Sequence, residues 1–230
     1  MIQIKNAVEL QKMRKVNAIS AAALKYGGEH IEPGMTTAEL DKIIYDFILR
    51  HGAKPNFKGL YGFPGTACIS LNDTVIHGLP SKNIVIRPGD IVSIDTGAKL
   101  DGFNGDNACT FACGKVDMEA QRLMDVTHEA LHLGVKAAQA GARVGDIGYA
   151  VQSYVEENGF SVVREFVGHG VGKELHEDPE VPNFGHAGRG PRLVPGMCIA
   201  IEPMVNQKNY AVKTLSDGWT VKTCDGGLAA

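Results

Sequence analysis

The sequence predicts an α+β fold of two pseudo-twofold-related halves, with helices covering one face of a curved, mostly antiparallel sheet. Two observations carry this prediction. Helical patterns and short β-rich runs occur together in each half of the chain, and the second half repeats the order of the first at a constant offset. A third observation, a pair of carboxylates at equivalent places in the two halves, indicates where the chemistry lies.

The first half begins with two helical patterns. Residues 8–30 carry apolar residues at helical spacing among good helix formers, and Asn6 suits the N-cap. Residues 37–51 predict a second helix, which Gly52 ends as a C-cap glycine would. The β-rich runs that follow, punctuated by glycine and proline, are 67–70 and 91–94.

The second half repeats this order. Helical patterns near 118–139 and 146–158 precede β-rich runs near 160–167, 198–205 and 219–223. Gly34–Leu40 is echoed by Gly141–Ile147, and Pro88–Asp95 aligns with Pro195–Glu202, each pair 107 residues apart. Several pairs in one register indicate duplicated halves. We therefore expect a single domain over residues 1–230, with one half at about 8–115 and the other at about 116–230.

Composition excludes several classes of protein. A formal net charge of -3 lacks the basic excess of a DNA-binding protein. No apolar run is long enough for a membrane span, and the N-terminal stretch has no signal-peptide core. The five cysteines are an odd number without a C-x-x-C pair, which argues against a disulfide framework or a thiolate zinc site. We expect a cytoplasmic protein with no DNA or membrane partner.

Four side chains form a candidate metal site. Asp95 and Glu202 close equivalent apolar runs, and a twofold relation would bring these costly buried acids together, where they need a cation or a shared proton. Asp106 lies eleven residues after Asp95, beyond glycines that allow a hairpin, and His169 lies in a glycine-rich stretch. Alone, Asp106 would be read as a turn former and His169 as structural. Together, the four favour Mn, Fe, Co or Zn.

Two other motifs are rejected. His128-Glu129-Ala130-Leu131-His132 matches H-E-x-x-H, which on a helix can bind zinc. Its polar residues, however, share the polar stripe of the helix with Asp125 and Lys136, as on a solvated surface. The glycine-rich stretch 168–173 fails as a dinucleotide loop, because Lys173 stands where the third glycine should be.

The candidate ligands and the stretches around them resemble the type I methionine aminopeptidases. The matching stretches are Cys68–Asn72 continuing to His77–Gly78, Ile94–Asp95, Asp101–Asp106, Gly168–Gly172, His176–Pro179 and Ile201–Met204. The resemblance runs from about residue 3 to the last residue. The short spacing from His169 to Glu202 and the lack of an N-terminal zinc-binding extension are typical of the short bacterial form.

The resemblance implies the pita-bread fold and a metal-dependent hydrolase. It implies N-terminal methionine excision from nascent proteins and peptides, with a metal-bound water as the nucleophile. Two divalent ions, Co, Mn, Fe or Zn, would be held by Asp95, Asp106, His169 and Glu202. The implied partner is the N-terminal methionine of nascent polypeptides, on a monomeric enzyme in contact with the ribosome.

The resemblance also assigns catalytic and pocket residues. Glu202 would accept a proton as well as bind metal, His176 would steady the developing oxyanion, and His77 would position the substrate backbone. The methionine side chain would enter an apolar pocket drawn from Phe57, Tyr61, Phe63, Cys68, Leu175, Met204 and Trp219. Without the resemblance, Trp219 would be read as ordinary core.

One departure from the family affects the metal site. The family's fifth ligand is a bridging Glu in a Gln-x-Glu-His segment, which follows a stretch like Asp217–Thr223 and includes a central β-run. The sequence reaches Ala230 before any such segment. We therefore expect these 230 residues to bind metal weakly, with the second ion lost, to turn over slowly or not at all, and to leave an open sheet edge.

Two other functions stay open. A non-catalytic pita-bread binding module would explain the missing Glu but would not need the four retained ligands. A prolidase-like or aminopeptidase P-like peptidase would share the fold but usually carries an extra N-terminal domain. Release of methionine from Met-Ala-Ser with added Co or Mn separates these functions.

Overall fold

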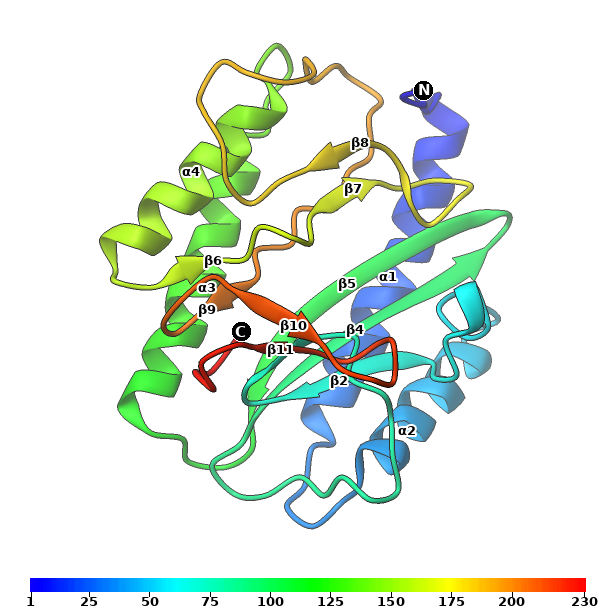
Figure 1. Ribbon diagram of the computed structural model, residues 1–230. Coiled ribbons are helices and arrows are strands. Elements are labelled where there is room, and N and C mark those ends of the chain that lie inside the picture. The colour runs from blue at the N-terminus through cyan, green and yellow to red at the C-terminus, as the bar shows by residue number, and fades with distance from the viewer.

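The computed structural model describes residues 1–230, with four α-helices and eleven strands (Figure 1). Every strand pair is antiparallel, in agreement with the α+β prediction. The strands do not form one continuous ladder, because they divide into four separately hydrogen-bonded groups. None of the helices has the length and hydropathy of a membrane-spanning segment.

Helices α1 (Ala7–Glu29) and α2 (Thr37–Arg50) pack against each other in the first half. Each begins with a capping box, at Asn6 and at Thr36. The N-cap side chain accepts the backbone N–H of the glutamate three residues later, and the side chain of that glutamate accepts the backbone N–H of the N-cap residue. The predicted N-cap at Asn6 is therefore confirmed. Gly52 follows α2 with a φ of 74°, the left-handed conformation of a C-cap glycine.

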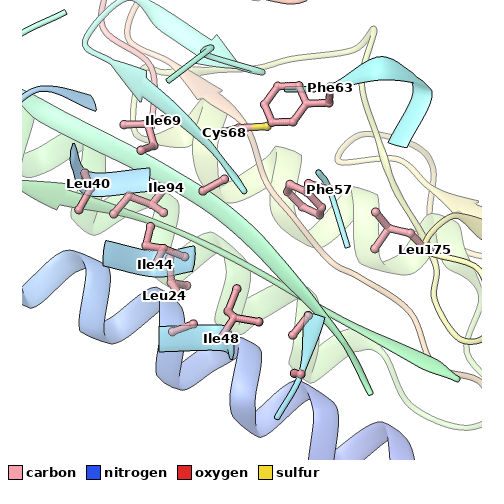
Figure 2. Packing of buried hydrophobic residues seen from close by; sticks show 14 of the residues in the cluster. Leu24, Leu40, Ile44, Ile48, Phe57, Phe63, Cys68, Ile69, Ile94 and Leu175 are labelled. Carbon is pink, nitrogen blue, oxygen red and sulfur yellow. The ribbon is translucent and has the colours of Figure 1, made fainter. Parts of the chain in front are cut away.

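Buried aliphatic side chains join this helix pair to the sheet. Leu24 of α1 and Ile44 and Ile48 of α2 share one buried cluster with the sheet residue Ile94, and Figure 2 shows Ile44 beside Ile94. Gly27 lets the helices approach, because a Cβ there would lie only 2.8 Å from Ile44 Cγ1. The first half therefore has a dense core that can hold a strand rigidly from behind.

The strands of the first half are β1 (Lys54–Pro55), β2 (Ala67–Leu71), β3 (Thr74–Ile76), β4 (Ile91–Leu100) and β5 (Phe103–Ala112), with a 3-10 turn, η1 (Leu60–Gly62), after β1. The hairpin β4–β5 pairs all ten residues of each strand and extends across the middle of the molecule (Figure 1). β4 also pairs with β1 and β2, whereas the other edge of β5 has no strand partner.

The second half opens with helices α3 (Met118–Ala137) and α4 (Val144–Glu157). α4 begins and ends 107 residues after α2. The backbone bridge Thr36–Val85 recurs at the same offset as Arg143–Arg192. The internal repeat inferred from the sequence is therefore present in the backbone hydrogen bonding.

The strands of the second half are short: β6 (Ser161–Val162), β7 (Gly168–Gly170), β8 (Glu177–Val181), β9 (Val205–Asn206), β10 (Val212–Thr214) and β11 (Val221–Thr223). β6 pairs with β9, and β7 pairs with β8. β10 and β11 continue onto β3 and so connect the two halves of the chain.

The predicted β-rich runs at 160–167 and 198–205 are only partly correct. Of the first, only β6 is a strand, and of the second, only β9, apart from a single bridge between Gly170 and Ile199. Two backbone bonds align this extended stretch with β7, from Val171 N–H to Cys198 O and from Ala200 N–H to His169 O. β7 has only three residues and also pairs with β8, so the stretch has too short a partner for a regular ladder.

Candidate functional site

Asp95 and Asp106 lie on one face of the β4–β5 hairpin. Asp95 is opposite Ala108, and Asp106 is opposite Gly97, so the two acids are diagonal neighbours. Gly97 is needed there, because a Cβ would lie 2.6 Å from the carbonyl oxygen of Gly105. This is the hairpin placement that the sequence predicts for the two acids.

His169 joins the second half to these acids. Its Nδ1 lies 2.8 Å from the carbonyl oxygen of Gly170 and donates to it. The other ring nitrogen, Nε2, then faces the carboxylates, 3.5 Å from Asp106 Oδ2 and 3.3 Å from Glu202 Oε1. Such an arrangement orients an imidazole as a metal ligand.

Glu202 lies in the irregular stretch beside β7. Its Oε1 is buried without a hydrogen-bond partner, which is costly for a polar atom. Its backbone carbonyl accepts a hydrogen bond of 2.9 Å from the side-chain amide of Asn183, which is 1% exposed. The sequence did not reveal that Asn183 supports the backbone at Glu202, because a single loop asparagine has no recognisable pattern.

The acids of the cluster lie close together with no cation beside them, and this shifts the pKa values of Asp95 and Glu202. Burial, with the charges of Asp106 and Glu202, raises the pKa of Asp95 well above its usual value. Burial and the charge of Asp106 raise the pKa of Glu202 to about 7. Burial opposes protonation of His169, but its contacts with Asp106 and Glu202 prevail and raise its pKa. No lysine or arginine forms an ion pair with the three acids.

The cluster fits a divalent cation chemically. Three carboxylates and one imidazole are ligands that Mn, Fe, Co and Zn accept, and the orphaned oxygen of Glu202 gains a partner when a cation binds. In this structure no three such side chains are already arranged around a metal position. Nε2 of His169 instead lies within ion-pair distance of Asp106 and Glu202, so these side chains would have to move apart for a cation to enter between them.

His176 and His77 lie beside the cluster. The ring centroids of His176 and His169 are 4.4 Å apart, and the ring of Tyr61 stacks over His176 at 6.2 Å. Burial and the charge of His169 lower the pKa of His176. Burial and the charge of His176 lower the pKa of His77, whose ring meets that of Trp219 at 6.3 Å. Both rings are therefore biased toward the neutral form.

Most of the predicted pocket residues share one apolar cluster. Phe57, Phe63, Cys68 and Leu175 are buried together, and the indole of Trp219 packs edge-on against Phe63 at 5.1 Å. Figure 2 shows the first four at one end of the core, with Phe63 beside Cys68. Cys68 is also directly opposite Asp95 in the sheet, so this cluster adjoins the acids.

Two pocket residues differ from the rest. Tyr61 is 78% exposed and has a φ of 50°, so it lies at the surface. Met204 belongs to a separate apolar cluster with Val75 and Val221. The predicted pocket therefore consists of a buried cluster of five residues, with Tyr61 at its solvent side and Met204 apart.

A cleft of about 930 Å³ adjoins the acids on another side. It is lined by Asp95, Asp106 and Glu202, by β5, by α3 and by residues 197–204. Of the seven predicted pocket residues, only Cys68 and Met204 line it. This cleft at the acids is thus distinct from the aromatic cluster that the resemblance assigns to the methionine side chain.

The H-E-x-x-H motif contributes no candidate site. His128, Glu129 and His132 are exposed on α3, and the two imidazole rings lie against each other with centroids 4.5 Å apart. None of the three forms an ion pair or hydrogen bond with the four clustered ligands. This agrees with the prediction of a solvated helix face, although His128 lines the outer part of the cleft.

Comparisons with known proteins agree with this geometry. Residues 11–226 match metallopeptidase family M24. A protein named methionine aminopeptidase from Clostridium perfringens is 54% identical over 230 residues, which is 100% of this chain and 92% of that protein. The crystal structure of methionine aminopeptidase from Rickettsia prowazekii has a TM-score of 0.98 at 39% identity, covering 100% of this chain and 93% of that one. The crystal structure of a prolidase from Pyrococcus horikoshii OT3 has a TM-score of 0.77 at 27% identity, and the match covers 88% of this chain and 56% of the prolidase chain.

Proposed function

Because the chain belongs to metallopeptidase family M24, we propose that it is a methionine aminopeptidase, which removes the N-terminal methionine from nascent proteins and peptides. Its fold is the α+β pita-bread fold of the methionine aminopeptidases in that family. A prolidase activity has less support, since the prolidase structure matches this chain less closely and is covered over only 56% of its length.

One observation carries the proposal beyond family membership. Asp95, Asp106 and Glu202 meet at His169 with no lysine or arginine to neutralise them, and one buried oxygen of Glu202 has no partner. A binding module would gain nothing from this costly arrangement. A divalent cation held by these four side chains would both neutralise the acids and supply the catalytic charge.

The metal would polarise the scissile carbonyl and acidify a water molecule. Glu202, one of the four side chains at the metal position, would take up the proton of that water and later pass it to the leaving amine. His176, next to His169, would donate its ring N–H to the substrate carbonyl oxygen as negative charge develops there. His77 would donate to the substrate backbone and fix its direction.

The apolar cluster suits a methionine side chain. Phe63, Trp219 and Leu175 present apolar and aromatic surface beside the acids, and thioether sulfur makes favourable contacts with aromatic rings. We assign the pocket to this cluster, with exposed Tyr61 as its closing side and Met204 at its border with the neighbouring apolar cluster.

The finer expectations stay predictions. They are two ions of Co, Mn, Fe or Zn, a monomeric state, a cytoplasmic location and contact with the ribosome. Calorimetric titration with Mn²⁺ measures the number of ions directly.

Hydrolysis of Met-Ala-Ser with added Mn²⁺ or Co²⁺ tests the proposal, with Ala-Pro as a prolidase substrate and Leu-Ala-Ser as a pocket control. Release of methionine from the first peptide alone is expected. Binding of Met-Ala-Ser without turnover, in protein that calorimetry shows to be loaded with metal, would favour the binding module. Faster cleavage of Ala-Pro would favour the prolidase reading.

A further inference from the structure

A buried ion pair outside the metal-binding residues joins the N-terminal segment to the turn that carries His176. Lys5 Nζ lies 2.6 Å from Glu177 Oε2, and the two side chains are 5% and 8% exposed. Burying such a pair costs desolvation free energy, and apolar side chains in its place are often as stable. Stability alone is therefore a weak reason for this pair.

Both charged groups also hold the backbone. Lys5 Nζ donates to the carbonyl oxygen of Gln3 at 3.2 Å, which fixes the lysine within its own segment. The second oxygen of Glu177, Oε1, accepts the N–H of Glu174 at 3.2 Å. Glu177 is therefore held at one oxygen by the N-terminal segment and at the other by the turn just before His176.

The pair is packed tightly into the base of that turn. A Cβ at Gly172 would lie 2.5 Å from Glu177 Oε1 and 2.6 Å from Lys5 Cε. The N–H of Gly172 donates to the carbonyl oxygen of Glu174 at 3.0 Å, and its own carbonyl oxygen accepts from the side-chain amide of Asn104 at 3.0 Å. The ion pair thus completes a turn that is anchored to β5 on its other side.

The N-terminal segment is itself well anchored. The N–H of Lys5 donates to the carbonyl oxygen of Gly196 at 2.8 Å, and a Cβ at Gly196 would lie 2.8 Å from the carbonyl oxygen of Lys5. The terminal ammonium of Met1 pairs with Asp178, so the N-terminus lies beside β8 (Figure 1). Lys5 therefore reaches Glu177 from a fixed point.

His176 depends on this turn for its position. No protein group hydrogen-bonds to its ring, whose neighbours are the rings of His169 and Tyr61 at centroid distances of 4.4 and 6.2 Å. The next residue, Glu177, begins β8 and pairs with Gly170 of β7. The backbone around Glu177 therefore sets the direction of the His176 ring relative to His169.

We infer that Lys5 is a positioning residue for His176 and acts through Glu177. The inference rests on the proposed function, in which His176 donates to the substrate carbonyl oxygen. Lys5 exchanges no proton and contacts no substrate. Its role is to keep Glu177, and with it the turn, in the one arrangement that aims the His176 ring at the reacting group.

The test compares Lys5→Met with the double variant Lys5→Met/Glu177→Met. Lys222→Met is the matched control, because Lys222 forms another long-range ion pair, at 2.9 Å from Asp73, that is about one-third exposed. Hydrogen exchange of the backbone amides from Gly172 to Glu177 is followed in each protein, with thermal stability and with kcat and KM for Met-Ala-Ser at saturating Mn²⁺.

In Lys5→Met, exchange in this turn is expected to become at least about 10-fold faster, while exchange in the helices is unchanged. kcat should fall about 10- to 100-fold with KM within threefold, as for a misplaced catalytic group. In the double variant thermal stability should recover, because no unpaired charge remains buried. Turn exchange should stay fast and kcat should stay low, whereas Lys222→Met should match the parent.

Two results would overturn the inference. One is unchanged turn exchange in Lys5→Met, which is decisive even if turnover of the parent is slow. The other is recovery of slow exchange and parental kcat together with stability in the double variant, which is the signature of a purely structural pair.

His176→Ala separates this inference from the proposed function. A loss of about 100- to 1,000-fold in kcat is expected for an oxyanion donor. If His176→Ala has that loss while Lys5→Met keeps parental kcat and exchange, the inference alone fails. If His176→Ala keeps full activity, the proposed role of His176 fails, and the inference fails with it.

Discussion

The two halves of the molecule share a plan but differ in regularity. Helices α2 and α4 are equivalent over their whole length, with the same 107-residue offset. The first half places Asp95 on a ten-residue strand, whereas its counterpart Glu202 lies on a stretch with only one bridge. The first half therefore presents its acids from a fully paired hairpin, whereas the second presents Glu202 from an irregular stretch that two backbone hydrogen bonds align with β7.

Helix packing is the part of the plan that both halves retain. Gly27 gives Ile44 room to pack, and 107 residues later Gly134 gives Val151 the same room. The two halves thus keep the contacts of their cores and differ in the strands. A duplicated scaffold can thus keep equivalent positions for two acids while the backbone pairing around them differs.

The largest expected effect is the loss of a ligand from either half. Asp95→Asn and Glu202→Gln should each lower kcat/KM by more than about 1,000-fold, because the residues act as one unit around the cation. Chelation with EDTA should abolish activity, and added Mn²⁺ should restore it. His132→Ala, on the exposed motif of α3 and outside the cleft, is the control and should stay within about twofold.

If one of these two variants keeps its activity, the two halves do not contribute equally to catalysis. Calorimetric titration of each variant with Mn²⁺ then reports which acid the cation needs. An equal loss of affinity in both would sharpen the comparison, because the rigid and the irregular half would contribute alike.

A second test uses the pH dependence of stability in metal-free protein. The pKa of Glu202 is raised from 4.5 to about 7, so the folded state binds protons that the unfolded state has released. The free energy of unfolding should therefore fall as pH rises from about 4.5 to 7. Mn²⁺ binds the deprotonated ligands, so the stabilisation it gives should grow over the same range.

Chemical denaturation at pH 5, 6 and 7, with and without Mn²⁺, measures both trends. Glu202→Gln removes the titrating group and should flatten the decline in metal-free protein. If the free energy of unfolding of this variant still falls with pH at the same slope, the effect belongs to another acid. In that case Asp95→Asn should flatten the pH dependence instead.

A third test compares the helix contacts of the two halves. Gly27→Ala and Gly134→Ala add a methyl group that meets Ile44 at 2.8 Å and Val151 at 2.9 Å. Overpacking costs about 1–3 kcal/mol, and the better helix propensity of alanine returns about 1 kcal/mol. Urea denaturation should show similar net losses in both variants.

The combination Gly134→Ala/Val151→Ala provides the control for this contact. It removes the methyl group that the new side chain meets, so its loss should be smaller than the sum of the two single losses. Strict additivity, or a large loss in only one half, would show that the two helix pairs are not equivalent in energy.

The smallest expected effect is the difference between the N-caps of α2 and α4. Thr36→Ala removes the hydroxyl that accepts the N–H of Glu39 and should cost about 1 kcal/mol. The equivalent Arg143 has no side-chain oxygen to accept such a bond, so Arg143→Ala should cost less. Urea denaturation of both variants checks this, and an equal loss would mean that Asp146, which accepts the N–H of Arg143 at 2.7 Å, carries the second cap.

Much of this protein is determined by its sequence alone. The 107-residue repeat, the helix ends at Asn6 and Gly52 and the four side chains that cluster at the candidate metal site can all be read from it, because they depend on local spacing, capping chemistry and the duplication itself. The strand predicted at 198–205 is only partly correct, for a physical reason. Apolar residues in sequence predict an extended backbone, but a regular strand also needs a neighbouring strand long enough to pair with it, which only the folded chain supplies.

Only the tertiary structure decided the contacts between distant residues. Nothing local links Lys5 to Glu177 or Asn183 to the carbonyl oxygen of Glu202, since such pairs depend on how turns are stacked in space. The same holds for the separation of Met204 from the aromatic cluster and for the cleft beside the acids. Sequence patterns report local backbone preference, whereas burial and side-chain partners come into being only when the two halves pack together.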